Sequence, residues 1–229
     1  MKHLIFDCGG VLVWPRLGEW NIPFGIFDIL GPRAQDMYSS KYLIAYRQAI
    51  SLLDEDQLVA NVEAERLLRR RYIETLNSLM DWHMTPGEIV RLADDFTDNA
   101  NRYGVFEDVA PWLNRWKQKY RLGMLSDAMP SILNFMDQWG ILSPFDATVI
   151  STQLGVTKPN PRMYEAILQR LDADPGDCLF VDDRIDNLTG AVTAGMQAVQ
   201  MARSAFLPRE IWDGPVVSDF EALNKWIEA

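Results

Sequence analysis

Residues 4–10 read Leu-Ile-Phe-Asp-Cys-Gly-Gly, an apolar run that ends in one carboxylate and two glycines. An apolar run without polar alternation predicts a strand, here about residues 2–7, that is buried on both faces of a parallel sheet. The two glycines let the backbone turn sharply and pass close to whatever Asp7 holds. This stretch therefore predicts a strand that presents Asp7 at its carboxyl end.

Two later apolar runs end in the same way. One is followed by Ser126 and Asp127, and the other by Asp182 and Asp183. Helical segments separate these runs, and such alternation predicts an α/β fold with a doubly wound parallel sheet. Ligands bind at the carboxyl ends of the strands in an open parallel sheet, so we expect these side chains to meet Asp7 there.

One long segment interrupts the alternation directly after the first strand. Residues 15–104 look helical and contain no convincing buried strand. We therefore expect residues 1–14 and 105–229 to form the α/β core, and residues 15–104 to form an inserted helical cap domain. In the core, further helices are expected at about residues 108–119, 130–139, 161–171 and 186–194 and at the C-terminus, with further strands at about 148–150 and 198–201.

The expected cap helices carry recognisable end signals. Apolar spacing predicts helix over residues 32–53, and Asp54 is expected to be the N-cap of a long helix that ends near Met80. Thr85, Pro86 and Glu88 have the pattern of a capping box that begins a helix to about Asn99. In the long helix we expect a solvated face whose basic residues pair with nearby glutamates: Arg66, Arg69, Arg70 and Arg71.

Composition limits the partners of the chain. The 229 residues carry a formal net charge of −10, which argues against nucleic acid or an anionic membrane as a partner. No signal peptide or membrane span is recognisable, so we expect a cytoplasmic protein. Cys8 and Cys178 lie in apolar runs, and we expect both to be buried free thiols.

A group of carboxylates at one edge of the sheet repels itself unless a positive charge lies between them. Lys158 is one candidate for that charge, and a hard divalent cation held by oxygen ligands is the other. Neither histidine is expected to take part, since His3 begins the first strand and His83 lies between two cap helices.

Four short motifs in this order resemble those of the haloacid dehalogenase superfamily, most of whose members are Mg²⁺-dependent phosphatases with a Rossmann-like core. The motifs are Phe-Asp-Cys-Gly-Gly-Val at 6–11, Leu-Ser-Asp at 125–127, Thr-Lys-Pro at 157–159 and Phe-Val-Asp-Asp at 180–183. The first motif is most similar to that of small sugar-phosphate phosphatases with an Asp-x-Gly pattern. The resemblance implies a small phosphorylated metabolite as substrate, and a monomer or homodimer.

The resemblance also implies roles for single residues. Asp7 would attack phosphorus and become an aspartyl-phosphate, and Mg²⁺ would be held by Asp7, the carbonyl of Gly9 and Asp183. Ser126 and the backbone N–H of Asp127 would bind a phosphoryl oxygen. Lys158 would neutralise charge on Asp7 and on the phosphate. Two further residues, Asp182 and Asn187, would orient these groups without binding the metal ion or the substrate themselves.

Two positions depart from the family pattern. Most phosphatases of the family carry an aspartate two residues after the nucleophile as the general acid, and here that residue is Gly9. We therefore expect aryl, acyl or anomeric phosphates, whose leaving groups depart readily, to be better substrates than primary alkyl phosphates. Asp127 stands where Asn or Thr is usual, and its carboxylate should point away from the phosphate or meet a cation.

Two alternative functions stay open. Metal-independent 2-haloacid dehalogenases of this superfamily also lack the second aspartate, and Arg33 or Arg47 could be the cap arginine that they need. They replace the last acidic pair with serine and asparagine, so Asp182 and Asp183 favour the phosphatase. The other alternative is a catalytically silent binding or regulatory module. The cap is expected to determine which substrate binds. Four aromatic residues just after the nucleophile could line the entrance, although most of them are expected to be packing residues: Trp14, Trp20, Phe24 and Phe27.

Overall fold

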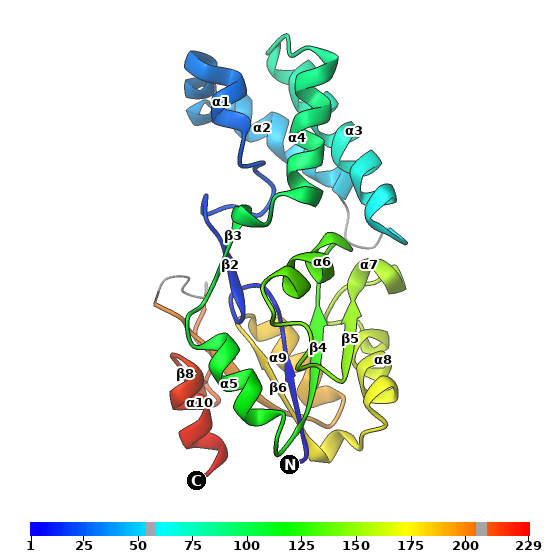
Figure 1. Cartoon of the computed structure of the whole chain (residues 1–229), viewed down its shortest axis with the longest axis vertical. Helices are drawn as coiled ribbons and strands as arrows, with labels where there is room; N and C mark the ends of the chain where they lie inside the picture. The colour runs from blue at the N-terminus through cyan, green and yellow to red at the C-terminus, as the bar shows by residue number, and fades with distance from the viewer. Residues whose placement is uncertain (54–57, 205–209) are drawn as a thin grey trace.

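The computed structural model describes residues 1–53, 58–204 and 210–229, and its centre is a six-stranded parallel sheet (Figure 1). The strand order is β5-β4-β1-β6-β7-β8, and every neighbouring pair is parallel. This arrangement confirms the predicted α/β class. The strands are β1 (His3–Phe6), β4 (Arg121–Ser126), β5 (Ala147–Ile150), β6 (Cys178–Asp182), β7 (Gln197–Met201) and β8 (Val216–Val217).

Helices cover both faces of this sheet, as the unbroken apolar runs predict. In β1, Leu4 and Phe6 join one buried cluster and Ile5 joins the other. The first cluster includes side chains of α5 (Val109–Trp116), α6 (Ser131–Gln138) and α10 (Phe220–Ile227). The second includes side chains of α8 (Pro161–Leu171) and α9 (Ile185–Thr193). The short α7 (Ser151–Leu154), like β8, was not predicted from the sequence.

The strand order brings three polar strand ends together. β1 lies between β4 and β6, and Phe6 is in register with Met124 on one side and Val181 on the other. The N–H of Asp7 donates to the carbonyl of Val181 over 2.9 Å, which continues the pairing by one residue. The predicted meeting of these strand ends is therefore confirmed.

A helical insertion separates β1 from the rest of the sheet in the chain. We use this name for residues 16–102, between β2 (Val13–Pro15) and β3 (Tyr103–Val105), which pair as an antiparallel ribbon. Figure 1 shows the insertion at one end of the molecule, and both termini at the other. The insertion has its own buried apolar cluster. Its α-helices are α1 (Ile26–Leu30), α2 (Ser40–Ile50), α3 (Val62–Met80) and α4 (Pro86–Asp98), with 3₁₀ turns at Gly31–Tyr38, Ser51–Leu53 and Ala100–Arg102.

The ribbon adds short, partly exposed strands at both ends of residues 15–104, which were expected to contain no convincing buried strand. Both predicted domain boundaries, at 14/15 and 104/105, fall inside it, and the division into a core and a cap domain stays a prediction. A strand of three residues is too short to show a period of two, so the pattern could not reveal it.

The long helix of the insertion begins later than predicted. Asp54 lies outside the described residues, and α3 begins at Val62 with Asn61 as its N-cap. The Asn61 side chain accepts the N–H of Ala64 over 2.9 Å, which satisfies one of the free donors of the first turn. The second predicted start is confirmed, because Thr85 and Glu88 form a reciprocal capping box at α4. No helix among residues 1–53, 58–204 and 210–229 is long and apolar enough to cross a membrane.

Packing between α8 and α9 gives a test of this fold. A Cβ on Gly190 would lie 2.5 Å from Tyr164 Oη and 2.9 Å from Pro159 Cβ. Gly190→Ala should therefore lower the free energy of unfolding by about 1–3 kcal/mol through overpacking. Gly87→Ala is the matched control, since no atom lies within 4 Å of that Cβ. The control should raise stability by about 0.4–1 kcal/mol. Urea denaturation measures both, and equal effects would contradict the packing described.

Candidate active site

A cavity of about 510 Å³ lies where the carboxyl ends of β1, β4 and β6 face the helical insertion. The sheet side supplies most of the residues singled out from the sequence: Asp7, Gly9, Ser126, Asp127, Lys158, Asp183 and Asn187. The insertion supplies Trp20, Asn21, Ile50, Leu53 and Arg69. Asp182 is fully buried behind the cavity wall.

A buried ammonium group holds the sheet side of the cavity together. Lys158 Nζ lies 2.8 Å from Asp7 Oδ1 and 2.7 Å from Asp182 Oδ2, and it donates to the carbonyl of Leu125 over 3.1 Å. Burial alone would lower the pKa of Lys158, but the attraction of Asp182, Asp7 and Asp127 raises it well above its usual value. The lysine is therefore charged at neutral pH, and it compensates the charge of two strand ends at once.

Asp182 has both carboxylate oxygens engaged. Oδ1 accepts the N–H of Arg184 at 2.8 Å and Asn187 Nδ2 at 3.1 Å. Oδ2 accepts Lys158 Nζ at 2.7 Å and Asn187 Nδ2 at 3.0 Å. Because each carboxylate oxygen has about two acceptor positions, little capacity is left for a further partner. Asp182 and Asn187 therefore orient Lys158 and the loop after β6.

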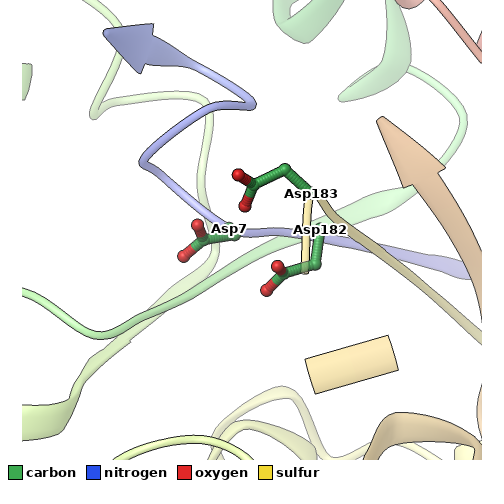
Figure 2. Close-up of side chains that lie close together, drawn as sticks. All are labelled: Asp7, Asp182 and Asp183. Carbon is green, nitrogen blue, oxygen red and sulfur yellow. The ribbon is translucent and has the colours of Figure 1, made fainter. Parts of the chain in front are cut away.

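Asp183 lies in a different setting from its neighbour. Figure 2 shows its carboxyl group near that of Asp7, and oxygens of Asp7, Asp182 and Asp183 lie within 4.8 Å of one another. Burial raises the pKa of Asp183 to about 8, and the charges of Asp182 and Asp7 push in the same direction. A Cβ on Gly10 would lie 2.8 Å from the Asp183 carboxyl group, so the glycine turn makes room for this side chain.

These groups fit a hard divalent cation. Burial also raises the pKa of Asp7, with Lys158 opposing this and Asp182 adding to it. Carboxylate oxygens of Asp7, Asp182 and Asp183 lie within 4.8 Å of one another, and Lys158 forms ion pairs with the first two. Carboxylate and carbonyl oxygens are the ligands that Mg²⁺ takes in proteins. With Asp182 engaged elsewhere, the residues available to hold the ion are Asp7 and Asp183, with the carbonyl of Gly9 in the same wall.

Ser126 is the last residue of β4, beside Asp7, and Asp127 follows it. The Ser126 side chain is buried, and its hydrogen bond to Asp7 favours the ionised carboxylate. Asp127 Oδ1 accepts the backbone N–H of Lys158 over 2.9 Å. The unusual carboxylate of Asp127 thus has a backbone partner and fixes the segment that carries the lysine.

Trp20 lies against the position where the family pattern has a second aspartate. A Cβ on Gly9 would lie 3.1 Å and 3.2 Å from two carbons of the indole ring, and Tyr103 packs against the same ring at 5.8 Å between centroids. A side chain at residue 9 would therefore have to displace the tryptophan. Of the four aromatic residues considered from the sequence, Trp20 lines the cavity, whereas Phe24 and Phe27 are exposed.

Arg69 corrects the interpretation of the basic cluster in α3. Arg66 and Arg70 form exposed ion pairs as expected, but Arg69 is buried and lines the cavity. Arg69 lies three residues before Tyr72 and seven before Leu76, both buried, so it shares their face of the helix. That spacing could have predicted that Arg69 is buried.

The two arginines that were considered for a dehalogenase lie elsewhere. Arg33 donates to the carbonyls of Leu30, Ile29 and Trp82, and Arg47 is exposed. Neither is among the residues that line the cavity.

Comparison with known proteins places this site in a wider group. The family model described as haloacid dehalogenase-like hydrolase matches residues 1–195. A glyceraldehyde 3-phosphate phosphatase from Methanopyrus kandleri is 32% identical over 124 residues, which are 51% of either chain. A phosphatase from Mycobacterium tuberculosis is 32% identical over 140 residues, or 60% of either chain. The chain thus matches between half and three fifths of the length of these relatives.

Solved structures share the whole fold at lower identity. A HAD phosphatase from Thermococcus onnurineus superposes with a TM-score of 0.64 at 20% identity, covering 99% of this chain and 98% of the other. An L-2-haloacid dehalogenase from Xanthobacter autotrophicus gives 0.66 at 20% identity, covering 100% and 99%. At such identities the likeness concerns the fold alone, since both kinds of chemistry occur on it.

Removal of the buried ammonium group tests the electrostatics of the site. Lys158→Met leaves Asp7 and Asp182 without their cation, so the free energy of unfolding should fall by about 3–5 kcal/mol. Lys225→Met removes an exposed lysine paired with Glu221 and should leave the free energy of unfolding almost unchanged, because solvent screens that pair. Urea denaturation of both variants checks this, and equal stabilities would contradict the role given to Lys158.

Proposed function

The chain belongs to the haloacid dehalogenase-like hydrolase family, and from this premise we propose that it is a Mg²⁺-dependent phosphatase of a small phosphorylated metabolite. The observation that carries the proposal is the carboxylate of Asp7, held by Lys158 beside Asp183 in a cavity of substrate size. Metal-independent dehalogenases replace the last acidic pair with serine and asparagine, so the presence of Asp183 favours the phosphatase. The named phosphatases among the relatives point the same way.

The proposed reaction has two displacements at phosphorus. An Asp7 carboxylate oxygen forms a bond to phosphorus while the bond from phosphorus to the ester oxygen breaks, and the leaving group departs as its oxyanion, which takes a proton from water. Water then attacks the phosphorus of the aspartyl-phosphate, the bond to Asp7 breaks and inorganic phosphate departs. Splitting one displacement into two is the advantage of a covalent nucleophile.

The chain's own residues hold the charge that this transfer moves. Lys158 is within hydrogen-bond distance of Asp7 and supplies positive charge beside the phosphoryl group. The Ser126 hydroxyl and the backbone N–H of Asp127 bind phosphoryl oxygens. Bound at Asp7, Asp183 and the Gly9 carbonyl, Mg²⁺ would neutralise charge on the phosphate. Such positioning and charge stabilisation account for most of the catalysis in phosphoryl transfer.

The helical insertion is the proposed cap of this enzyme. It closes one side of the cavity with Trp20, Asn21 and Arg69, so it meets the part of the substrate that leaves. Residue 9 is glycine and Trp20 lies against it, so no carboxylic acid at this position protonates the leaving oxygen. The preferred substrates are therefore phosphates whose leaving group departs without that help.

Hydrolysis of an aryl phosphate tests the function directly. We expect turnover that requires Mg²⁺ and is lost with EDTA, and a fall of roughly 10⁴-fold or more for Asp7→Asn, which lacks the nucleophile. Asp183→Asn should lose activity and require more Mg²⁺. The exposed Asp186, three residues further on, is the matched control, and Asp186→Asn should keep normal activity.

Each alternative function has its own outcome in this assay. Halide release from a 2-haloacid that is insensitive to EDTA would replace the phosphatase with a dehalogenase. Phosphate binding without turnover of either substrate would indicate a silent binding module.

The nature of the leaving group gives a second test. Aryl phosphates should exceed a primary alkyl phosphate in kcat/KM by about 10²–10⁴-fold, the usual value of general acid help. Equal turnover of both would contradict the proposal. In the double variant Gly9→Asp/Trp20→Ala the new carboxyl group has room, so the aryl preference should shrink relative to Trp20→Ala alone.

A further inference from the structure

One charged side chain of the cavity has no part in the chemistry at phosphorus. Arg69 is 5% exposed and lines the same cavity as Asp7 and Lys158, but it comes from α3 in the helical insertion. Its Cζ lies 4.3 Å from the ring centroid of Phe96, so packing fixes the guanidinium plane.

The guanidinium is short of hydrogen-bond partners. Nη1 donates to Asn21 Oδ1 over 2.9 Å. Nε is buried and has no hydrogen-bond partner among the described residues, because Glu65 Oε1 lies 3.7 Å away. An arginine carries five N–H donors, and leaving them unpaired in a buried position is costly. Because Arg69 also lines the cavity, a ligand bound there could supply an acceptor to its remaining N–H donors.

The surrounding charge is also incompletely balanced. The Glu65 carboxylate is shared, since it accepts the backbone N–H of Ser131 at 2.8 Å and its hydroxyl at 3.0 Å. A second buried arginine, Arg102, lies 4.2 Å from the same ring of Phe96. Burial lowers the pKa of Arg69, Glu65 opposes this, and Arg102 adds to the lowering. Two buried cations, Arg69 and Arg102, thus lie against the ring of Phe96, and the carboxylate beside Arg69 is that of Glu65, at 3.7 Å.

We propose that Arg69, oriented by Asn21, binds a second anionic group of the substrate, a carboxylate or a second phosphate, while the transferred phosphoryl group lies at Asp7 and Lys158. The inference rests on the proposed phosphatase function and narrows its substrate class to small phosphate esters with two anionic groups. The planar fork of a guanidinium matches the oxygens of a carboxylate or phosphate in two parallel hydrogen bonds. Both ends of such a molecule fit within about 510 Å³.

Matched aryl phosphates test this with the intact protein. We compare 3-carboxyphenyl phosphate with 3-carbamoylphenyl phosphate, which has the same shape and no second charge, and 1,3-phenylene bisphosphate supplies the second phosphate. The wild type should prefer an anionic substrate over the carbamoyl compound by about 10- to 100-fold in kcat/KM, mainly through a lower KM. The better of the two anions identifies the group that Arg69 binds.

Variants assign the preference to the arginine. Arg69→Gln should reduce the preference to near unity, and Arg69→Lys should restore part of it. Arg70→Gln changes an exposed neighbour on α3 that pairs with Glu74, and it should leave the preference unchanged. Because Arg69→Gln removes packing on Phe96, its thermal unfolding is measured as well. If that variant does not fold, Asn21→Asp replaces it in the test. Its new carboxylate would neutralise the charge of Arg69, so the preference for anionic substrates should weaken.

The outcomes separate this inference from the proposed function. The inference is wrong if the carbamoyl compound is hydrolysed as fast as the anionic esters, or if the preference survives Arg69→Gln or Asn21→Asp. Either result would leave the proposed phosphatase function standing. Hydrolysis of none of the three esters would overturn the proposed function, and the inference with it.

Discussion

The buried ammonium group of Lys158 is the interaction on which the site depends. Parallel pairing forces the ends of β1 and β6 together, and with them the carboxylates of Asp7 and Asp182. Charges buried in this way are tolerated only when they are paired and hydrogen-bonded. Lys158 supplies the pairing, and Asp127 and the carbonyl of Leu125 hold it in place from the end of β4. The same contact that permits the fold also holds Asp7 where it can attack.

The two parts of the structure contribute different chemistry to one cavity. The sheet brings the proposed nucleophile Asp7, a cation and carboxylates that fit a metal ion. The helical insertion brings an indole ring against Gly9 and a buried guanidinium with unused donors. The groups from the sheet are suited to the proposed transfer of the phosphoryl group, and those from the helical insertion to binding the leaving group. A conserved type of reaction centre can thus serve different substrates when the inserted helices change.

Much of the α/β part could be predicted because its signals are local and strong. Apolar runs that end in Asp7, Ser126 and Asp182 are typical of buried strands of one sheet, and parallel topology then puts their ends side by side. The capping box at Thr85 was equally readable, since it needs only four residues. The ribbon of Val13–Pro15 and Tyr103–Val105 was missed, because its two strands are three residues long and lie far apart in the chain.

By itself, the sequence determined the class of fold, the strand ends and the set of groups around Asp7, because each of these follows from periodicity and from motifs a few residues long. Only the tertiary structure decided what faces those groups from the insertion. Trp20 reaches Gly9, and Arg69 turns from an expected surface residue into a cavity residue, because α3 packs on the core through Glu65 and Ser131. Glu65 and Ser131 are 66 residues apart in the chain, and no local pattern predicts that they meet in space.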